Sequence, residues 1–511
     1  MNGYPIKQRF ASLWTCSGGS AEAEDLRATG LRLSVSLGVL IFCFSSTTLF
    51  AQILNTNQSQ PPVTVVVGTD NPSVDVAAVQ SAVDKGGTVI LRGTFDFGND
   101  AGNHIIVPGR AYPAQDDKGR STVFIYQADV RILGETGLQG ELLTVIKNGR
   151  PTFWIGWDGE ALRLPPSGTS NVDFGTESFP QDALGRVAYR DGFQDPGYSG
   201  PQTRYARAFQ NINVTIKSIY FDSPKHYGIK AAACHDVSVI GNVFKNVQFG
   251  GLVHANNVFP ATSIAAGFIA AGSLYAPFIF PAITGEVVAE RNLVDGSGTE
   301  PIHTHSGECF GLGALATHAD VTIARNEIRN IGRGLNGIGS DATAGSILLV
   351  DNYSESLLVT QNTVYNSSGY GIYDLAVFAA TPGATIEHNT LTNCVNGILS
   401  YSYAGPRSGV TIHQNAFLQD GLMGSGGSCI IGNALSDSLI RANTFEGEYI
   451  GPLVVFLSST DCTLLENRDL RPRPLLSPTY FLDVSSSGNL VRGAGTALDL
   501  GSNNSILLID N

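Results

Sequence analysis

Basic residues are scarce in this chain. Lysine and arginine together number 31, against 44 aspartates and glutamates, and the formal net charge is −13. No lysine follows Lys245. A protein that binds nucleic acid neutralises phosphates with clustered lysine and arginine. The composition therefore excludes nucleic acid as a partner, and the acidic excess is typical of a soluble exported protein.

Cysteine is also sparse. Beyond residue 51 the chain has five cysteines: Cys234, Cys309, Cys394, Cys429 and Cys462. An odd and widely spaced set is not a disulfide framework, and without a Cys-x-x-Cys pair the usual zinc signature is missing. We expect buried free thiols.

Two apolar segments of the sequence could interact with a membrane. The first, residues 33–44, follows Arg27 and Arg32 and precedes small residues that end at Ala51. This order is that of a secretory signal with cleavage after Ala51, and an uncleaved anchor is the alternative. We expect residues 1–51 to be a signal peptide with a long N-terminal extension. The mature chain would then be secreted, periplasmic or on the cell surface.

The second run lies within residues 256–285, which carry no charged side chain. Its length alone would permit a membrane span. Gly267, Gly272, Pro277 and Pro281 would break any helix, however. We expect buried strands or a hydrophobic lid, with lipid contact as the alternative, and no integral span in the mature chain.

The chain does contain a repeat. An apolar residue, two variable residues, Asn, one variable residue and a second apolar residue recur, as in Ile323-Ala-Arg-Asn326-Glu-Ile328 and Ile386-Glu-His-Asn389-Thr-Leu391. Most successive copies are 23–28 residues apart, which suits a coil of three short strands and three turns. Larger steps of 34, 36 and 50 indicate insertions.

The repeated asparagines predict a buried column at one corner. Each side chain would bond the backbone of the neighbouring coil, which satisfies polar groups that water cannot reach. The expected ladder comprises Asn242, Asn292, Asn326, Asn362, Asn389, Asn415 and Asn443. A glycine follows most copies eight or nine residues on, for example Gly371 and Gly397, where a tight corner with positive φ would favour it.

These residues resemble the right-handed parallel β-helix proteins of the pectate-lyase-like superfamily over about residues 75–510. Asp75-Val-Ala-Ala-Val-Gln80, followed by Gly87-Thr-Val-Ile-Leu91, resembles the helix and first strand that open such solenoids. Ser73 would cap that helix. A left-handed β-helix would repeat every 18 residues, which this chain does not. One copy of the motif also fits the leucine-rich repeat consensus. Its apolar positions, however, are mostly Val, Ile, Thr and Phe, which favour β-strands.

We therefore expect an all-β, right-handed parallel β-helix with an N-terminal capping helix and loop insertions. The predicted organisation is a signal segment at 1–51, a linker at 52–72 and a single β-helix domain at 73–510. Insertions are expected at about 147–210 and 255–310. The first is rich in aromatic residues, including Trp154 and Trp157. Such rings stack on sugars, or they hold a long loop against the coils.

A histidine-rich segment precedes Cys309. His303 and His305 alternate, so on a strand they would share a face, and Glu308 follows. Two imidazoles and a carboxylate suit acid–base catalysis or metal ligation, and solvent-facing loop histidines are the alternative. If the chain is an enzyme, these three residues are the predicted catalytic set.

Four lysines fall within 29 residues, at Lys217, Lys225, Lys230 and Lys245, with His226 among them. On adjacent coils they would form a cationic strip for an acidic polysaccharide; solvated charges facing different ways are the alternative. The predicted substrate-binding residues are Lys225, His226, Lys230, Lys245, Trp154 and Trp157.

Two function classes remain open. The resemblance implies lyases with Ca²⁺-binding aspartates and a basic residue, or hydrolases with an aspartate cluster, and neither set is present here. Arg471-Pro-Arg473-Pro lies in the expected C-terminal tail, and Tyr370-Gly-Ile-Tyr373-Asp374 approaches an epimerase signature without its histidine. We predict an exported solenoid that binds glycans or attaches to a surface. The alternative is a lyase, hydrolase or epimerase for an acidic polysaccharide, with Ca²⁺ open as a cofactor and no metal site or oligomeric state assigned.

Overall fold

The computed structural model describes most of the chain beyond residue 60. The described residues are 61–98, 123–125, 127–149, 152–155, 213–224, 227–231, 234–246, 264–271, 283–296, 308–315, 317, 319–331, 345–354, 356–376, 381–403, 405–420, 427–472 and 477–509. The expected signal segment lies outside them. No helix in this part of the chain is long and apolar enough to cross a membrane.

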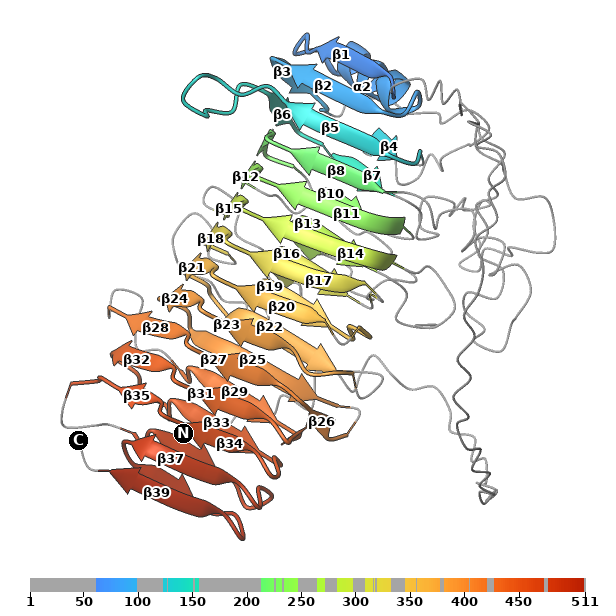
Figure 1. Cartoon of the computed structure of the whole chain (residues 1–511). Coiled ribbons are helices and arrows are strands. Elements are labelled where there is room, and N and C mark those ends of the chain that lie inside the picture. The colour runs from blue at the N-terminus through green and yellow to red at the C-terminus, as the bar shows by residue number, and fades with distance from the viewer. Residues whose placement is uncertain are drawn as a thin grey trace, which may run out of the picture. The chain divides into compact units, whose positions relative to one another are not determined.

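Three parallel sheets make up the fold (Figure 1). Sheet A contains β1 (Val63–Val67), β2 (Thr88–Arg92), β5 (Val130–Gly134), β8 (Val214–Lys217), β11 (Cys234–Ile240), β14 (Ile283–Glu290), β17 (Asp320–Ala324), β20 (Leu357–Thr360), β23 (Thr385–Glu387), β27 (Thr411–His413), β31 (Leu439–Arg441), β34 (Thr463–Leu465), β37 (Leu490–Ala494) and β39 (Ser505–Ile509).

Sheet B contains β3 (Thr94–Asp96), β6 (Val145–Lys147), β9 (Tyr220–Asp222), β12 (Val243–Lys245), β15 (Leu293–Asp295), β18 (Glu327–Arg329), β21 (Thr363–Tyr365), β24 (Thr390–Thr392), β28 (Ala416–Gln419), β32 (Thr444–Gly447) and β35 (Arg468–Asp469). Sheet C contains β4 (Val123–Ile125), β7 (Phe153–Ile155), β10 (Tyr227–Ala231), β13 (Ile264–Ala271), β16 (Glu308–Leu315), β19 (Gly345–Val350), β22 (Tyr370–Ala376), β25 (Asn396–Ser402), β29 (Ile430–Asn433), β33 (Val454–Leu457), β36 (Tyr480–Leu482) and β38 (Ala497–Asp499). Two short strands, β26 (Arg407–Ser408) and β30 (Leu435–Ser436), pair separately.

From β2 to β36 the coils visit sheets A, B and C in turn, and each strand pairs in parallel with the corresponding strand of the next coil. Parallel crossovers of this kind wind right-handed. The predicted right-handed parallel β-helix is therefore confirmed. Part of the charge-free run forms β13, which pairs with β10 and β16 in sheet C.

The core is built from the inward row of each sheet. In sheet A, Val359, Ile386, Ile412 and Ile440 are fully buried and aligned in register. Phenylalanines stack in the same way in sheet B, where the rings of Phe221 and Phe244 lie 4.7 Å apart. Burying each such side chain contributes about 1.5–3 kcal/mol, so the repeat supplies the stability of the fold.

Glycines on sheet C allow close packing. Gly371 and Gly397 do not have positive φ, contrary to the sequence expectation. A Cβ on Gly371 would lie 2.2 Å from a methyl carbon of Leu391, and one on Gly397 would lie 2.5 Å from the ring of Phe417. These positions are glycine because the core side chains of sheet B reach them.

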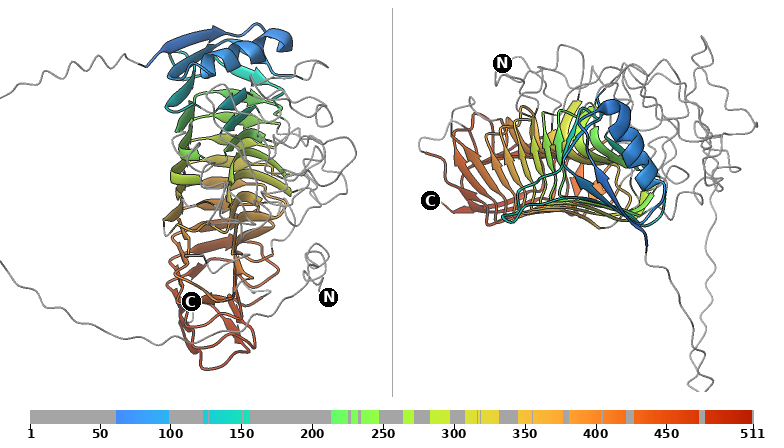
Figure 2. Two further views of the ribbon diagram at one scale, coloured as in Figure 1. Left: turned by 90° about the vertical axis from the view of Figure 1, so that its right-hand side faces the viewer. Right: turned by 90° about the horizontal axis from the view of Figure 1, so that it is seen from above.

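The helix α2 (Pro72–Val83) lies across the N-terminal end of the coils (Figure 2). Its apolar face, including Val76, Val79 and Val83, is buried, which closes the open end of the core. The N-cap is Asn71, whose side chain accepts the Ser73 N–H, and not Ser73 itself. β1 lies within the range expected to be a linker, and it pairs with β2 along its whole length.

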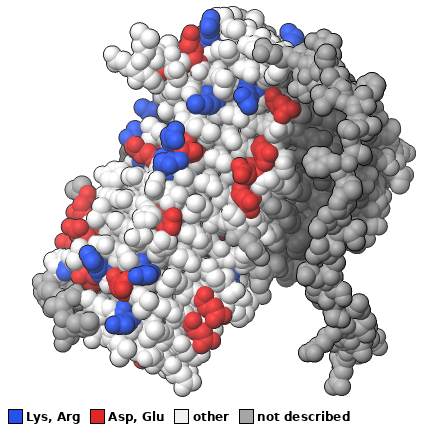
Figure 3. All heavy atoms as spheres, in the orientation of Figure 1, with Lys and Arg blue, Asp and Glu red and all other residues white. Residues whose placement is uncertain are grey.

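The outer surface mixes both signs of charge. Acidic and basic side chains are interspersed on the face drawn in Figure 3. On sheet B, consecutive coils place Asp96, Lys147, Asp222, Lys245, Asp295 and Arg329 in one register row of alternating sign. Arg329 and Asp295 form an ion pair at 3.1 Å. Opposite charges on neighbouring coils favour this register.

Candidate functional site on sheet C

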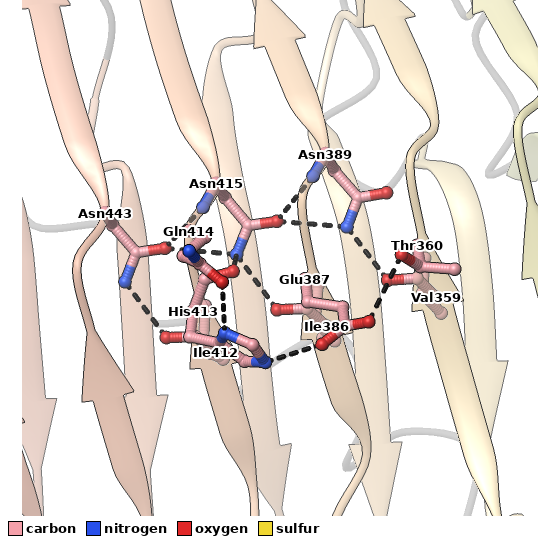
Figure 4. A network of polar contacts seen from close by, with 10 residues as sticks. All are labelled: Val359, Thr360, Ile386, Glu387, Asn389, Ile412, His413, Gln414, Asn415 and Asn443. Carbon is pink, nitrogen blue, oxygen red and sulfur yellow. Dashed lines mark hydrogen bonds and ion pairs between the residues drawn. The ribbon is translucent and has the colours of Figure 1, made fainter.

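The asparagine column is structural. From Asn292 onward, each Asn Oδ1 accepts the backbone N–H and the Nδ2–H of the asparagine in the preceding coil. Each Nδ2 also donates to a backbone carbonyl on the neighbouring sheet A strand of the preceding coil. The chain of bonds runs without a break through Asn242, Asn292, Asn326, Asn362, Asn389, Asn415, Asn443 and Asn467. Figure 4 shows three of them side by side. All are buried, so none is available to a ligand.

Insertions border sheet C. The long connections join sheet B to sheet C, as between β12 and β13, or sheet C to sheet A, as between β7 and β8. At the ladder asparagines the corner between sheets A and B is short, with one residue of positive φ before each asparagine, such as Gln361 before Asn362. Because loops beside a rigid sheet commonly carry function, sheet C is the candidate face.

A second apolar cluster covers the outer face of sheet C. In β19, Ile347 and Leu349 belong to the core, whereas Leu348 and Val350 belong to the other cluster. Alternating strand residues point to opposite faces, so this cluster lies on the side of sheet C away from the core, although its seven members are themselves buried. It comprises Phe310, Leu315, Leu348, Val350, Tyr373, Leu375 and Leu399, with Tyr353, Tyr370, Tyr401 and Ile431 packed against them.

Four tyrosines gather on this face. The rings of Tyr370 and Tyr373 stack with centroids 4.9 Å apart, and those of Tyr401 and Tyr403 lie 4.1 Å apart. Tyr403 is the most open, with 44% of its surface exposed. Burial is the main reason that the pKa of Tyr403 rises to about 12, and the phenols of Tyr401 and Tyr370 add to it. The hydroxyl groups are therefore protonated at neutral pH and can donate hydrogen bonds.

A buried ion pair lies beneath the tyrosines. Arg407 Nη1 donates to Asp374 Oδ2 at 2.6 Å, and both side chains are 1% exposed. Ser400 Oγ donates to the same carboxylate oxygen, and Arg407 also donates to the carbonyls of Thr381 and Pro382. Asp374 therefore points into the core and fastens the turn beside sheet C, so it cannot reach a substrate on the outer face.

The predicted substrate-binding residues that the structure describes lie on different sheets. Lys230 and Trp154 are register partners in sheet C, in the row that continues through Leu348 and Tyr373. The Lys230 side chain is 1% exposed. Lys245 lies on sheet B between Asp222 and Asp295, and Lys217 lies on sheet A. Lys225, His226 and Trp157 lie outside the described residues.

Lys217, Lys230 and Lys245 therefore do not form one cationic strip. Their spacing of about half a coil carries them around the solenoid onto three different sheets. The described side chains on the outer face of β19, β22, β25, β29 and β33 are all uncharged. This surface is aromatic and aliphatic in character.

His303 and His305 lie outside the described residues. Glu308 is the first residue of β16, where its backbone pairs with Ile264, and its side chain is not described. The structure thus places the end of this motif at the margin of sheet C, next to Phe310. Within the described part of the chain, no group of three His, Cys, Asp or Glu side chains is arranged to hold a metal ion.

Sequence reasoning missed one imidazole–carboxylate pair. His413 Nε2 lies 2.6 Å from Glu387 Oε2, and His413 Nδ1 faces Gln414 Oε1 at 3.2 Å (Figure 4). Glu387 and His413 each stand two residues before a ladder asparagine, one coil apart, so the repeat could have revealed the contact. Both ring nitrogens are engaged, so the pair joins neighbouring coils of sheet A and leaves no nitrogen for a substrate.

Arg471 lies inside a coil and not in a tail. It follows β35, donates twice to Asp469 and bonds Ser477, and sheets A and C continue beyond it. The described cysteines, Cys234, Cys394, Cys429 and Cys462, are buried free thiols, as expected.

The fold defines the chain as a right-handed parallel β-helix protein, the architecture of the pectate-lyase-like proteins. No family model and no curated protein matches the sequence. Similar solved structures include the A-module of the mannuronan C-5 epimerase AlgE4 of Azotobacter vinelandii, with 12% identity, 87% of this chain and 95% of that chain covered, and a TM-score of 0.35. The surface adhesin PfbA of Streptococcus pneumoniae has 12% identity, 81% and 92% coverage, and a TM-score of 0.35. Because these TM-scores are low, the fold is assigned from the parallel strand pairing within the chain itself.

Proposed function

We propose that this chain is an exported glycan-binding solenoid, which receives a carbohydrate chain on the outer face of sheet C. The observation that carries the proposal is the group of Tyr370, Tyr373, Tyr401 and Tyr403 on β22 and β25, beside the corners where the insertions occur. Tyr370, Tyr373 and Tyr401 lie outside the main core, in or against the second apolar cluster of sheet C.

The chemistry of the face favours a sugar. Pyranose rings present apolar C–H patches that pack on aromatic rings, and their hydroxyl groups accept hydrogen bonds from neutral phenols. Burial holds the pKa of Tyr370 and Tyr401 above the ordinary value, so these phenols donate throughout the neutral range. With no charged side chain described on this part of the face, a neutral glycan fits better than a uronate polymer.

Binding fits better than catalysis. Glycoside hydrolysis and uronate chemistry need paired carboxylates, or a base beside the substrate. Among the described residues, the carboxylate next to the tyrosines is that of Asp374, which is buried and ion-paired. The described part of the tyrosine face thus offers contact area without an acid–base pair.

The test is a binding screen of the purified chain against neutral and uronate polysaccharides, followed by calorimetry with the best oligosaccharide. Tyr403→Ala removes the most exposed ring and should weaken binding about 5- to 150-fold, since one stacked ring contributes roughly 1–3 kcal/mol. Tyr365→Ala is the matched control, because Tyr365 is exposed on sheet B at 37%. If both variants bind like the parent chain, sheet C is not the binding face.

A carbohydrate-active enzyme is the second candidate, and one observation favours it. Glu308, the last of the predicted catalytic set of His303, His305 and Glu308, opens β16, and in sheet C only β19 lies between β16 and the tyrosine-bearing strand β22. Assays for reducing ends and unsaturated products, with and without Ca²⁺, test this reading. Turnover that His303→Ala and His305→Ala both leave unchanged would remove these residues from the mechanism.

A further inference from the structure

A separate hollow lies on the outer face of sheet A, near its N-terminal end. Its volume is about 540 Å³, which is within the range of small-ligand sites. It is lined by the starts of β2, β5, β8 and β11 and by Pro61. These strands belong to the first coils, and the sheet C tyrosines belong to β22 and β25.

Polar side chains form one row across the floor of the hollow. Strand pairing aligns Thr88, Arg131, Thr215 and Ser238 on four successive coils. All four point outward, because the following residues Val89, Ile132, Ile216 and Val239 are buried in the core. The next member of the row, Val288, is apolar, so the polar row ends with the hollow.

Two carboxylates flank this row in fixed positions. Asp129 Oδ1 accepts Asn213 Nδ2 at 2.6 Å, and Asn213 Oδ1 faces the Asp129 N–H at 3.3 Å. Asp236 Oδ1 accepts the Glu286 N–H at 2.8 Å, and its Oδ2 lies 3.3 Å from His235 Nε2. Each carboxylate is thus oriented before any ligand arrives, while the side chain of Arg131 has no hydrogen-bond or ion-pair partner among the described residues.

The charged side chains that line the hollow favour a neutral ligand. An anion would face Asp129 and Asp236, and a cation would face Arg131. A neutral molecule with many hydroxyl groups suits all of these groups at once, since each hydroxyl donates to a carboxylate and accepts from a guanidinium or threonine. Strands about 4.8 Å apart present these partners at intervals comparable to the width of a sugar ring.

We propose that this hollow is a second binding site, for one or two units of a neutral sugar, independent of the tyrosine face of sheet C. Thr88, Thr215 and Ser238 supply hydroxyl groups, Arg131 supplies donors, and Asp129 and Asp236 accept from the sugar. The proposal does not depend on the sheet C site, because none of its residues lies on that sheet.

The experiment uses the purified full chain with cellobiose, maltose and lactose as neutral probes and digalacturonate as the acidic probe. Saturation-transfer NMR detects contact, and calorimetry gives affinity. Thr215→Val keeps the branched shape but removes the hydroxyl, and Arg131→Gln removes the charge. Each should weaken binding of the neutral probe about 3- to 10-fold, the effect of one lost hydrogen bond.

Thr322→Val is the matched control, because Thr322 lies in the same outward row two coils beyond Ser238. It should leave affinity unchanged. A melting curve confirms that each variant is folded. The proposal is overturned if no neutral probe binds, if digalacturonate binds more tightly than every neutral probe, or if Thr215→Val and Arg131→Gln both match the control.

Discussion

Replacing Asn389 by alanine should destabilise the solenoid more than any neighbouring polar substitution. Asn389 Nδ2 donates to the Val359 carbonyl at 2.9 Å and to Asn415 Oδ1 at 3.0 Å. Its Oδ1 accepts the Asn362 N–H at 2.9 Å and Asn362 Nδ2 at 3.0 Å. Alanine would leave one backbone N–H and one backbone carbonyl unpaired in the core.

The cost follows from these two groups. A buried polar group without a partner costs about 1–3 kcal/mol, so Asn389→Ala should lower the free energy of unfolding by about 2–6 kcal/mol. Thr363→Ala, an exposed residue on the adjacent strand β21, should cost less than about 0.5 kcal/mol. Asn504, part of a shorter column near the C-terminus, is partly exposed, and water can replace its bonds to Asn489. Asn504→Ala should therefore cost less than about 1 kcal/mol.

Urea unfolding followed by circular dichroism measures all three, and amide exchange around β20 and β23 shows whether the loss is local to the coil. If Asn389→Ala costs no more than Thr363→Ala, the ladder does not stabilise the coils. If Asn504→Ala costs as much as Asn389→Ala, burial is not what gives the ladder its strength.

Three further predictions follow from the coils. Ala442 has a φ of 53°, so Ala442→Gly should raise the unfolding free energy by about 0.5–1 kcal/mol in urea titrations, whereas Ala416→Gly in a strand should lower it. Lys245→Glu would place three carboxylates in one row, with Asp222 and Asp295 on either side, and should lower the free energy of unfolding by about 1 kcal/mol at low salt and by less in 1 M salt. Lys217→Glu, the control on sheet A, should leave the free energy of unfolding nearly unchanged. Equal effects of the two substitutions would refute the role of the alternating charges. Burial raises the pKa of the Cys462 thiol to about 11 and that of Tyr480 to about 12, so above pH 9 the unfolded chain releases protons that the folded chain retains. Stability should fall as pH rises from 9 to 11, and a flat urea midpoint over that range would contradict it.

The sequence by itself determined the architecture. A solenoid brings residues one repeat apart into contact, so the spacing of the asparagines already specified which side chains stack, and Asn389 meets Asn362 and Asn415 as the period predicts. The helix that closes the N-terminal end was likewise readable from its apolar face, although its cap is Asn71.

Only the tertiary structure decided which residues share an outer face. Insertions change the length of each coil, so spacing along the chain no longer tells on which sheet a residue falls, and Lys217, Lys230 and Lys245 go to sheets A, C and B. Within one strand, alternation of side chains then determines which residues point into the core and which point outward. Tyr373 lies on the outer face, and Asp374, the next residue, pairs with Arg407 in the interior. The tyrosine face and the sheet A hollow both arise from strand pairing between coils, which local sequence does not specify.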